Sequence, residues 1–191
     1  MSKNILVIAG SPKKDGNTDT LVDWFTQGAR SRGANVEVVR SAFLKYKTGG
    51  CISCRVCQSS DVYECVIRDE ASPVLEKMAR VDVIVMATPL YFFGPSAQLK
   101  VIFDRMFSLY KWDNAAGTMQ TPLKGKTLIL LASAFEDVGL DCLEKPFSLT
   151  AEYTGMPFKS LLVPNAGVSG DIKNRADMQE KAVALGRSAA E

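Results

Sequence analysis

The feature that most constrains the fold is the recurrence of short apolar segments between stretches with helical spacing. These segments are rich in Val, Ile and Leu, and they cover Ile5 to Ala9, Val36 to Arg40, Val83 to Ala87, Thr127 to Ala132 and Ser160 to Val163. Continuous apolar runs are typical of strands covered on both faces, and their alternation with helices implies parallel pairing through right-handed crossovers. The sequence therefore predicts a doubly wound α/β fold.

Apolar spacing predicts the helices between these strands. A helix from Thr18 carries apolar residues at every fourth position, and Gly33 is placed to end it at C′ in a left-handed conformation. A second helix from Pro95 has an apolar stripe, and the charged residues of its last turns, Arg105 among them, are expected on its solvent side. Weaker helical patterns cover Ser72 to Arg80, Val138 to Thr154 and Arg175 to Ala190.

Two long segments show neither pattern and are expected to be irregular: Ser41 to Asp69 and Ser108 to Leu123. Irregular segments of this length within a compact domain are usually functional or disordered. With 191 residues, 47% of them hydrophobic, the chain is long enough for one sizeable core. We therefore expect a single domain over residues 1–191, with a Cys-rich insertion at about 41–69.

Charge and hydropathy narrow the classes of function. The net charge of +2 comes with no long run of one sign, which favours neither nucleic acid nor an anionic membrane as a partner. No apolar run approaches the ~20 residues that span a bilayer. The first residues lead directly into the first expected strand without a signal-peptide pattern, which indicates a cytoplasmic protein with reduced cysteines.

Histidine is absent from the sequence. Its absence excludes Ser-His and Cys-His nucleophilic pairs, His-ligated zinc and His-ligated haem. A redox cofactor that carries its own reactivity suits this composition, because the protein then supplies only binding, orientation and electrostatic tuning.

A polar loop, Ser11 to Thr18, leaves the first expected strand and enters the first helix. A helix N-terminus has unpaired N–H groups and a partial positive charge, so this loop is a candidate phosphate site. A nucleoside-triphosphate loop needs four residues between its glycines and then a lysine, whereas five residues separate Gly10 from Gly16 here. We expect a monophosphate held by Ser11, Asn17, Thr18 and backbone N–H groups; the alternative is a polar turn with Thr18 as N-cap.

Ligands of open α/β sheets bind beyond the carboxyl ends of the strands. Two further loops are expected at that edge, Thr88 to Gly94 and Ser133 to Phe135. Leu90, Tyr91 and Phe92 are suited to lie against a flat aromatic ring, with backbone N–H groups offered to its polar edge. The alternative is that the aromatic residues at this strand end are core packing.

The motifs from Gly10 to Thr18 and from Thr88 to Arg105 together resemble those of the flavodoxin-like NAD(P)H-dependent FMN reductases. The resemblance implies a five-stranded parallel sheet in the order 2-1-3-4-5, with helices on both faces, and FMN as cofactor. It implies phosphate contacts from Ser11, Lys13, Asn17 and Thr18, isoalloxazine contacts from Pro89, Leu90, Tyr91, Phe92 and Gly94, and Ala132 and Ser133 near the ribityl chain. Lys13 departs from the family, which often has Arg there, so a bidentate phosphate contact becomes a point charge.

Four cysteines lie close together in the expected insertion. Cys51, Cys54 and Cys57 are each separated by two residues, and Cys65 follows after seven more. Four thiolates without histidine suit an iron–sulfur cluster, whereas a zinc site of four cysteines usually draws on two separated Cys-x-x-Cys pairs. The spacing resembles that of the iron–sulfur flavoprotein branch of the same family, which implies a [4Fe–4S] cluster, although the last gap lies at the upper limit of that pattern. The alternative is four ordinary reduced thiols in a surface loop. Cys142 lies apart and is expected to pack within a helix.

The resemblance implies an oxidoreductase. NAD(P)H would transfer hydride to N5 of FMN, and the reduced flavin would pass electrons to an acceptor, with no protein acid or base required. A cluster would divide the two electrons into single steps toward a one-electron protein such as a ferredoxin; the acceptor is otherwise a small molecule.

The rival class is an FMN-binding electron carrier or redox sensor without a pyridine-nucleotide site. Small flavodoxins of that class tend to be acidic for docking, whereas this chain has a pI of about 8.2. The family resemblance also implies a homodimer or a dimer of dimers, with Ser108 to Leu123 as the segment that reaches the neighbouring subunit's flavin.

Overall fold

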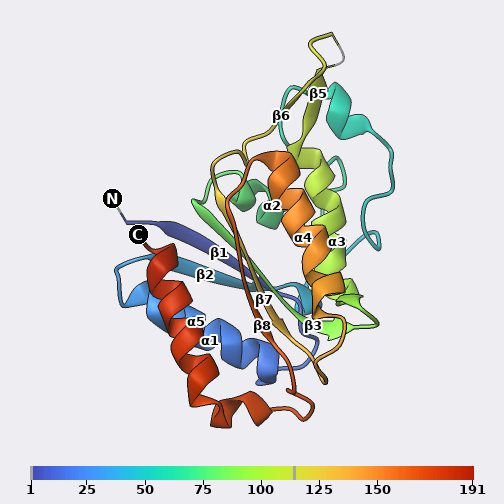
Figure 1. Cartoon of the computed structure of the whole chain (residues 1–191). Helices are drawn as coiled ribbons and strands as arrows, with labels where there is room; N and C mark the ends of the chain where they lie inside the picture. Colours follow the sequence, from blue (N-terminus) through green and yellow to red (C-terminus); the bar gives the residue numbers. More distant parts are fainter. Residues whose placement is uncertain (1, 114) are drawn as a thin grey trace.

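A parallel sheet forms the centre of the computed structural model, which describes residues 2–113 and 115–191 (Figure 1). Its strands are β1 (Asn4–Ala9), β2 (Asn35–Arg40), β3 (Val83–Tyr91), β7 (Thr127–Ser133) and β8 (Phe158–Val163), in the order β2-β1-β3-β7-β8. Neighbours along this path pair in parallel, and a short β4 (Gly94–Pro95) turns back antiparallel against the end of β3. The doubly wound fold and the strand order are confirmed.

Helices cover both faces of the sheet (Figure 1). One face carries α1 (Asn17–Arg30) and α5 (Ala176–Ala189), and the other carries α2 (Ser72–Met78), α3 (Ala97–Arg105) and α4 (Leu140–Thr154). Alternate strand residues serve the two faces: Val7 packs in the cluster that contains Phe25 of α1, whereas Leu6 packs in the cluster that contains Leu99 of α3. Because both faces are covered, the strands have continuous apolar sequences.

Two glycines let α1 and α5 pack closely. A Cβ atom at Gly28 would lie 2.1 Å from the carbonyl oxygen of Val183, and a Cβ atom at Gly186 would lie 2.1 Å from the carbonyl oxygen of Phe25. The two backbones therefore meet with no side chain between them. This contact holds α1, and with it the loop that precedes α1, against the sheet.

The predicted helices are found within a few residues of their expected bounds, with differences in detail. Gly33 has a φ of +83° as expected, but it lies two residues beyond the C-cap, Ser31, rather than one. Arg105 is only 1% exposed and is not on the solvent side of α3, because it pairs with Asp69. Cys142 is exposed on α4, so its expected packing role is wrong.

The two segments expected to be irregular differ from each other. Residues 108–123 are not wholly irregular, because they contain a hairpin of β5 (Lys111–Asp113) and β6 (Thr118–Gln120), with position 114 outside the described residues. Residues 41–69 are largely irregular and contain only two short 3-10 helices, η1 (Ser41–Phe43) and η2 (Val56–Ser59). Two more 3-10 helices are η3 (Met106–Leu109) and η4 (Asp171–Asn174).

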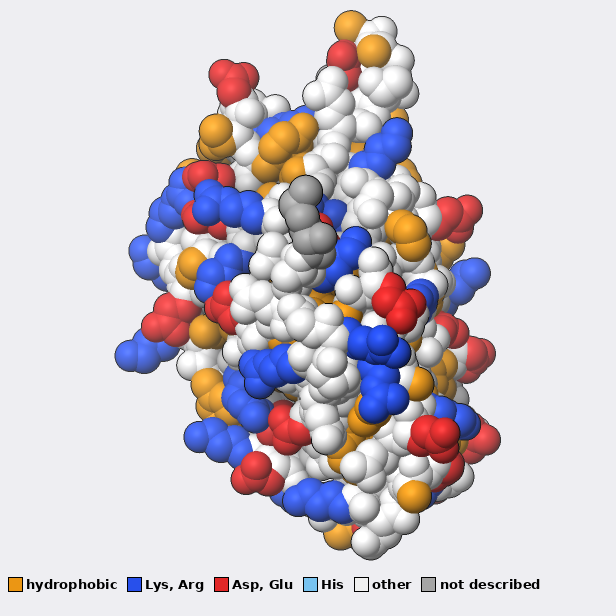
Figure 2. Space-filling model, turned by 90° about the vertical axis from the view of Figure 1, so that its left-hand side faces the viewer, with side chains coloured by type: hydrophobic (Ala, Val, Ile, Leu, Met, Phe, Trp, Pro, Cys, Tyr) orange, Lys and Arg blue, Asp and Glu red, His pale blue; other side chains and the backbone are white. Residues whose placement is uncertain are grey.

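Charged side chains of both signs are mixed over the face shown in Figure 2. This distribution agrees with the small net charge of +2. In the described part of the chain, no helix has both the length and the apolar character needed to cross a membrane.

Candidate functional site

A cleft opens at the carboxyl ends of β1, β3 and β7. It encloses about 740 Å³ including its open mouth, and its lining comprises Ser11, Lys13, Gly16, Asn17, Thr18, Pro89, Leu90, Tyr91, Ser133, Phe135, Ala166, Gly167 and Ser169. Most of the residues that the sequence nominated for cofactor binding are thus brought together from three separate parts of the chain. They are Ser11, Lys13, Asn17, Thr18, Pro89, Leu90, Tyr91 and Ser133.

The first wall of the cleft is the turn between β1 and α1. Gly10 is required there, because a Cβ atom would lie 2.6 Å from the Cβ of Leu99. The backbone N–H of Lys13 donates to Ser11 Oγ at 3.2 Å, which closes the turn. The N-cap of α1 is Gly16, without a side-chain cap, so the alternative with Thr18 as N-cap is wrong. The N-terminus of α1 therefore reaches the cleft without a capping side chain, an arrangement that suits an anion.

The side chain of Asn17 is fully engaged within the protein. Its Nδ2 donates to the carbonyl oxygens of Ala166 (2.8 Å) and Val168 (2.9 Å). Its Oδ1 accepts from the backbone N–H groups of Gly170 (2.9 Å) and Ile172 (3.3 Å). Since the amide has two donor hydrogens and one acceptor oxygen, these bonds use its whole capacity. Asn17 therefore holds the loop after β8 in place, and a direct phosphate contact would have to use its backbone N–H.

The second wall is the loop after β3. Thr88 Oγ1 accepts from the backbone N–H of Ser96 (2.9 Å), and Ser96 Oγ donates to the carbonyl oxygen of Gly10 (2.7 Å), which joins this loop to the first wall. At the tip, Phe92 and Phe93 have φ values of +45° and +65°. Bulky residues rarely adopt this conformation, and here it leaves both rings exposed to solvent.

Three of the residues nominated from the sequence do not line the cleft. Phe92 is exposed and borders a neighbouring hollow with Leu90, Phe93, Phe135, Glu136 and Val138. Gly94 is half-buried in β4. Ala132 is 0% exposed and lies in the core. Their cofactor contacts remain predictions.

The third wall was predicted only in part, because the sequence placed the loop from Ser133 to Phe135 at this edge but not the loop after β8. It consists of Phe135 after β7 and the loop after β8, where Ala166 N–H donates to the carbonyl oxygen of Ala134 at 2.8 Å. Gly167 lies so close to Phe135 that a Cβ atom would be 2.8 Å from the ring. The loop after β8 could have been predicted, because residues 164–169 directly follow the fifth expected strand and so lie at the same edge of the sheet as the other loops.

The described lining of the cleft carries one positive charge. Lys13 is the charged residue among the described residues that line it, and no carboxylate does so. Thr18 Oγ1 and Ser133 Oγ are hydrogen-bonded at 3.1 Å, which connects the start of α1 to the end of β7. The lining therefore offers hydroxyl groups, a helix N-terminus and one cation, which together suit a phosphate group.

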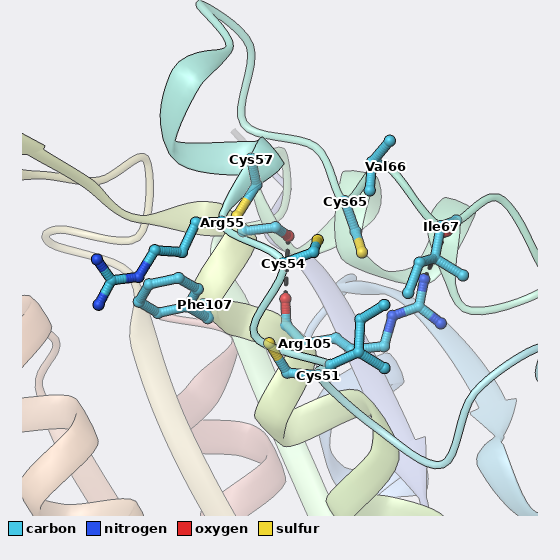
Figure 3. Close-up of a pocket in the computed structure, with 11 residues that line it drawn as sticks. Cys51, Cys54, Arg55, Cys57, Cys65, Val66, Ile67, Arg105 and Phe107 are labelled. Atoms are coloured by element: carbon cyan, nitrogen blue, oxygen red, sulfur yellow. Dashed lines mark hydrogen bonds between the residues drawn. The ribbon is translucent and has the colours of Figure 1, made fainter.

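A second pocket brings the four nominated cysteines together (Figure 3). Cys57 is buried, Cys65 is partly buried, Cys51 and Cys54 are exposed, and all four are free thiols. The thiols of Cys54 and Cys65 are turned toward each other in Figure 3. Among the described residues, no three Cys, Asp or Glu side chains are placed so that they could hold a metal ion. The cysteines thus share one pocket without forming a closed set of ligands.

A buried ion pair anchors the cysteine segment to the core. Arg105 Nη1 donates to both carboxylate oxygens of Asp69 (2.7 and 2.8 Å), and Arg105 Nη2 donates to the carbonyl oxygen of Ile67 (2.7 Å). Asp69 also accepts from the backbone N–H groups of Lys47 and Ala71. Burial acts to raise the pKa of Asp69, but these hydrogen bonds and the Arg105 charge lower it below its ordinary value. The pair therefore fastens the chain on both sides of the four cysteines.

The family model described as NADPH-dependent FMN reductase matches residues 3–166 of this chain. That range contains the first two walls of the cleft and all four cysteines of the pocket. The chain belongs to the NADPH-dependent FMN reductase family.

Among curated relatives of this FMN reductase family member is an iron–sulfur flavoprotein of Methanocaldococcus jannaschii, 35% identical over 101 residues. The match covers 53% of this chain and 50% of that protein. A second iron–sulfur flavoprotein, from Methanosarcina thermophila, is 34% identical over 98 residues, with 51% and 49% covered. The chain is thus matched over about half the length of these curated relatives.

A solved structure with the same fold covers the FMN reductase family member in full. The NAD(P)H:quinone oxidoreductase from Methanothermobacter marburgensis has a TM-score of 0.75 at 17% identity, over 100% of this chain and 98% of that one. An FMN-dependent NADH-azoreductase from Bacillus anthracis, solved in complex with FMN, was also found, with a TM-score of 0.73 at 13% identity over 98% and 100% of the two chains. At these identities the likeness establishes the flavodoxin-like fold.

In this FMN reductase family member, the cleft and the cysteine pocket lie at opposite ends of α3. Leu90 and Tyr91, just before the helix, line the cleft, whereas Arg105 and Phe107, at its end, line the cysteine pocket. The helix has nine residues and is therefore roughly 13 Å long at ~1.5 Å per residue.

Proposed function

We propose that this chain binds FMN in the cleft and is an NAD(P)H-dependent oxidoreductase that passes electrons to a separate acceptor. The observation that carries the proposal is the lining of the cleft. One wall offers an uncapped helix N-terminus and a lysine, and another offers apolar and aromatic side chains, at the carboxyl edge of the sheet. Membership of the FMN reductase family supports it, as does the FMN bound by the azoreductase of the same fold.

In this proposal residues 1–191 act as one FMN-binding domain, and each wall of the cleft has its own part. Ser11, Lys13, Thr18 and the N–H groups at the start of α1 bind the phosphate, with Asn17 supporting them. The isoalloxazine ring lies against Pro89, Leu90 and Tyr91, near Phe92 and Gly94. The ribityl chain passes Ser133 and the backbone at Ala132. Phe135 and the loop of residues 166–169, which line the same cleft, complete the enclosure.

FMN supplies the hydride-accepting chemistry when it is bound. The chain contributes binding and orientation, since it contains no histidine and no Asp or Glu is among the described residues that line the cleft. We expect the nicotinamide donor and the acceptor to reach the flavin through the open mouth of the cleft in turn, which favours a ping-pong order of events.

Rapid mixing tests this proposal. FMN-loaded protein mixed anaerobically with NADH or NADPH should lose the absorbance of oxidised flavin, and the steady-state rate law should be ping-pong. Reduction by dithionite but by neither nucleotide would contradict the reductase and favour an electron carrier or redox sensor. Failure of the protein to bind FMN in a titration would contradict both.

We also propose that Cys51, Cys54, Cys57 and Cys65 hold a [4Fe–4S] cluster, which would pass electrons singly between the flavin and a one-electron acceptor protein. The four thiols line one pocket, and they supply the four cysteine ligands that such a cluster needs. Cys51 and Cys54 are exposed, and cluster binding would require their thiols to approach Cys57 and Cys65. Four of the curated relatives are named iron–sulfur flavoproteins, which supports the assignment.

Iron and sulfide analysis after anaerobic reconstitution tests the cluster. Wild type should bind about four irons per chain, and Cys54→Ser should bind far fewer. Cys142→Ser is the matched control, because Cys142 is an exposed thiol on α4 outside the pocket, and it should behave as wild type. Fewer than about three irons in wild type, or no difference for Cys54→Ser, would leave an FMN reductase without a cluster.

The proposed assembly is a homodimer or a dimer of dimers. The hairpin β5–β6 projects away from the sheet (Figure 1), and Trp112 on it is 51% exposed, which suits a contact with a neighbouring subunit. Light scattering during gel filtration should give at least twice the chain mass of 20.8 kDa. A monomer at micromolar concentration would contradict the proposal.

A further inference from the structure

Arg105 has one polar atom that nothing in the described structure explains. Its side chain is 0% exposed, and its two terminal nitrogens are used by Asp69 and Ile67. Its Nε atom is buried and has no hydrogen-bond partner among the described residues. Buried side-chain donors are almost always paired, so a lone buried N–H calls for a specific explanation.

The residue that carries the unpaired Nε lines the cysteine pocket. Arg105 lines that pocket together with Cys51, Cys54, Cys57 and Cys65. In Figure 3 the guanidinium is seen next to Ile67, and the rest of the side chain runs along the pocket. Two bonds to Asp69 and one to Ile67 fix the plane of the guanidinium, so the Nε–H has a set direction and little freedom to seek another acceptor.

The charge of Arg105 is already balanced by Asp69. What Arg105 still offers to the pocket is therefore one oriented, water-shielded N–H donor. An acceptor of matching chemistry is a sulfur atom bearing negative charge, as in a thiolate or a sulfide of a cysteine-bound cluster. Hydrogen bonds to such sulfurs stabilise the reduced, more negative state and so raise the reduction potential.

We propose that Arg105 donates its Nε–H to a sulfur of the cluster held by the four cysteines, as a positioning residue that raises the cluster's reduction potential. This inference rests on the proposed cluster. The arginine has two functions: its terminal nitrogens anchor the cysteine segment through Asp69 and Ile67, and its Nε serves the cluster.

Nitrogen hyperfine spectroscopy tests the hydrogen bond directly. The full chain is produced with nitrogen-15 at arginine Nε, reconstituted anaerobically and reduced, and the cluster is examined by pulsed electron paramagnetic resonance. We expect a weak arginine coupling in wild type and none in Arg105→Lys. The midpoint potential of the Arg105→Lys cluster should be more negative than that of wild type, because lysine keeps the charge beside Asp69 but has no Nε–H.

Arg55→Lys is the matched control, since Arg55 also lines the pocket but is exposed. It should keep both the coupling and the wild-type potential. If Arg105→Lys fails to fold, the comparison of wild type with Arg55→Lys still tests the proposal, because Arg55 and Arg105 are the arginines among the described residues that line the pocket. A nitrogen coupling in both proteins assigns the donor to Arg105. Absence of the coupling from either protein overturns the proposal. A wild-type cluster without arginine coupling, or an unchanged potential in Arg105→Lys, refutes this inference alone. A wild type that takes up no iron refutes the cluster itself, and with it this role for Arg105, while leaving FMN binding as a separate result.

Discussion

The cleft and the cysteine pocket, at the two ends of α3, are built in different ways. The cleft is formed by loops from three separate parts of the chain, which are tied together by hydrogen bonds from Ser96 to Gly10 and from Asn17 to the loop after β8. The cysteine pocket is formed by the side chains of one long segment packed against the end of α3, and the ion pair of Asp69 with Arg105 anchors that segment. Two of its cysteines are exposed.

This difference indicates that the cleft is formed before its ligand binds, whereas the cysteine pocket is not. The loops that form the cleft are joined by hydrogen bonds of Thr88, Ser96 and Asn17 that are satisfied within the fold, so the cleft is preorganised and binding there costs little ordering. The cysteine segment has its anchors in place, but its centre would have to be drawn together by what it binds, so ligand binding and ordering of residues 41–69 are coupled. Changes at the anchor should therefore act mainly on the cysteine pocket, and changes in the hydrogen bonds between walls should act mainly on the cleft.

The largest expected effect is that of Asp69→Asn. Removing one charge of a buried pair leaves the other uncompensated, so the free energy of unfolding at about pH 7 should fall by roughly 3 kcal/mol, as measured by urea denaturation. Protection of residues 41–69 from hydrogen exchange should fall with it, while the dissociation constant of FMN changes little. If the free energy of FMN binding fell by as much as the free energy of unfolding, the two sites would not be independent as proposed. Asp177→Asn, an exposed carboxylate paired with Arg175, is the control and should change stability little.

The same variant has a defined pH dependence. The pKa of Asp69 is lowered in the folded state, so its contribution is fully present above the ordinary carboxyl value of 3.8 and is lost as the pH falls through the folded-state value. The stability difference between wild type and Asp69→Asn should therefore be full at about pH 7 and shrink as the pH falls below 3.8. A difference that stays constant over this range would contradict the lowered pKa.

Gly10→Ala should have the next largest effect, on the cleft. The added Cβ atom would lie 2.6 Å from the Cβ of Leu99 and 2.8 Å from Ser96 Oγ, which forces the first two walls apart. Overpacking of this kind costs about 1–3 kcal/mol in the free energy of unfolding, and FMN affinity should fall as well. Gly49→Ala, in the cysteine segment, is the matched control because its Cβ atom would meet nothing within 4 Å. Equal effects of the two variants would argue against a preorganised cleft.

Asn17→Ala should weaken FMN binding about tenfold, as measured by titration, because four hydrogen bonds to the loop after β8 are lost at once. Hydrogen exchange of residues 166–172 should rise in the same variant without FMN. Asn35→Ala removes an exposed side-chain hydrogen bond to Asn4 and should leave both measurements unchanged. If FMN affinity falls while exchange of the loop is unaltered, Asn17 contacts the phosphate rather than the loop.

The smallest expected effect is that of Lys13→Arg, a gain of about threefold in FMN affinity, because the guanidinium can meet a phosphate with two parallel hydrogen bonds. The gain should shrink at high salt, since Lys13 is exposed. Lys14→Arg is the control, because the ammonium group of Lys14 lies over the Phe43 ring and Lys14 is not part of the cleft lining. Equal affinity for both variants would remove Lys13 from the phosphate site.

The sequence by itself determined the strands, two of the three walls of the cleft and the Phe135 side of the third, whereas the strand order was implied by the family resemblance. The reason is that these features are local: continuous apolar runs such as Ile5 to Ala9 predict buried strands, and the polar loop before α1 follows from a strand, a turn and a helix in succession. The close spacing of Cys51, Cys54 and Cys57 likewise brought them to notice as one group.

Only the tertiary structure decided how distant residues are used. Asn17 is engaged by a loop about 150 residues away in the sequence, and Arg105 is buried by Asp69, 36 residues earlier. Helical periodicity could not reveal that Arg105 belongs inside, because a buried arginine is stabilised by a partner that the helix does not contain. Polar side chains are placed by their partners, and the partners are brought within reach only when the chain has folded.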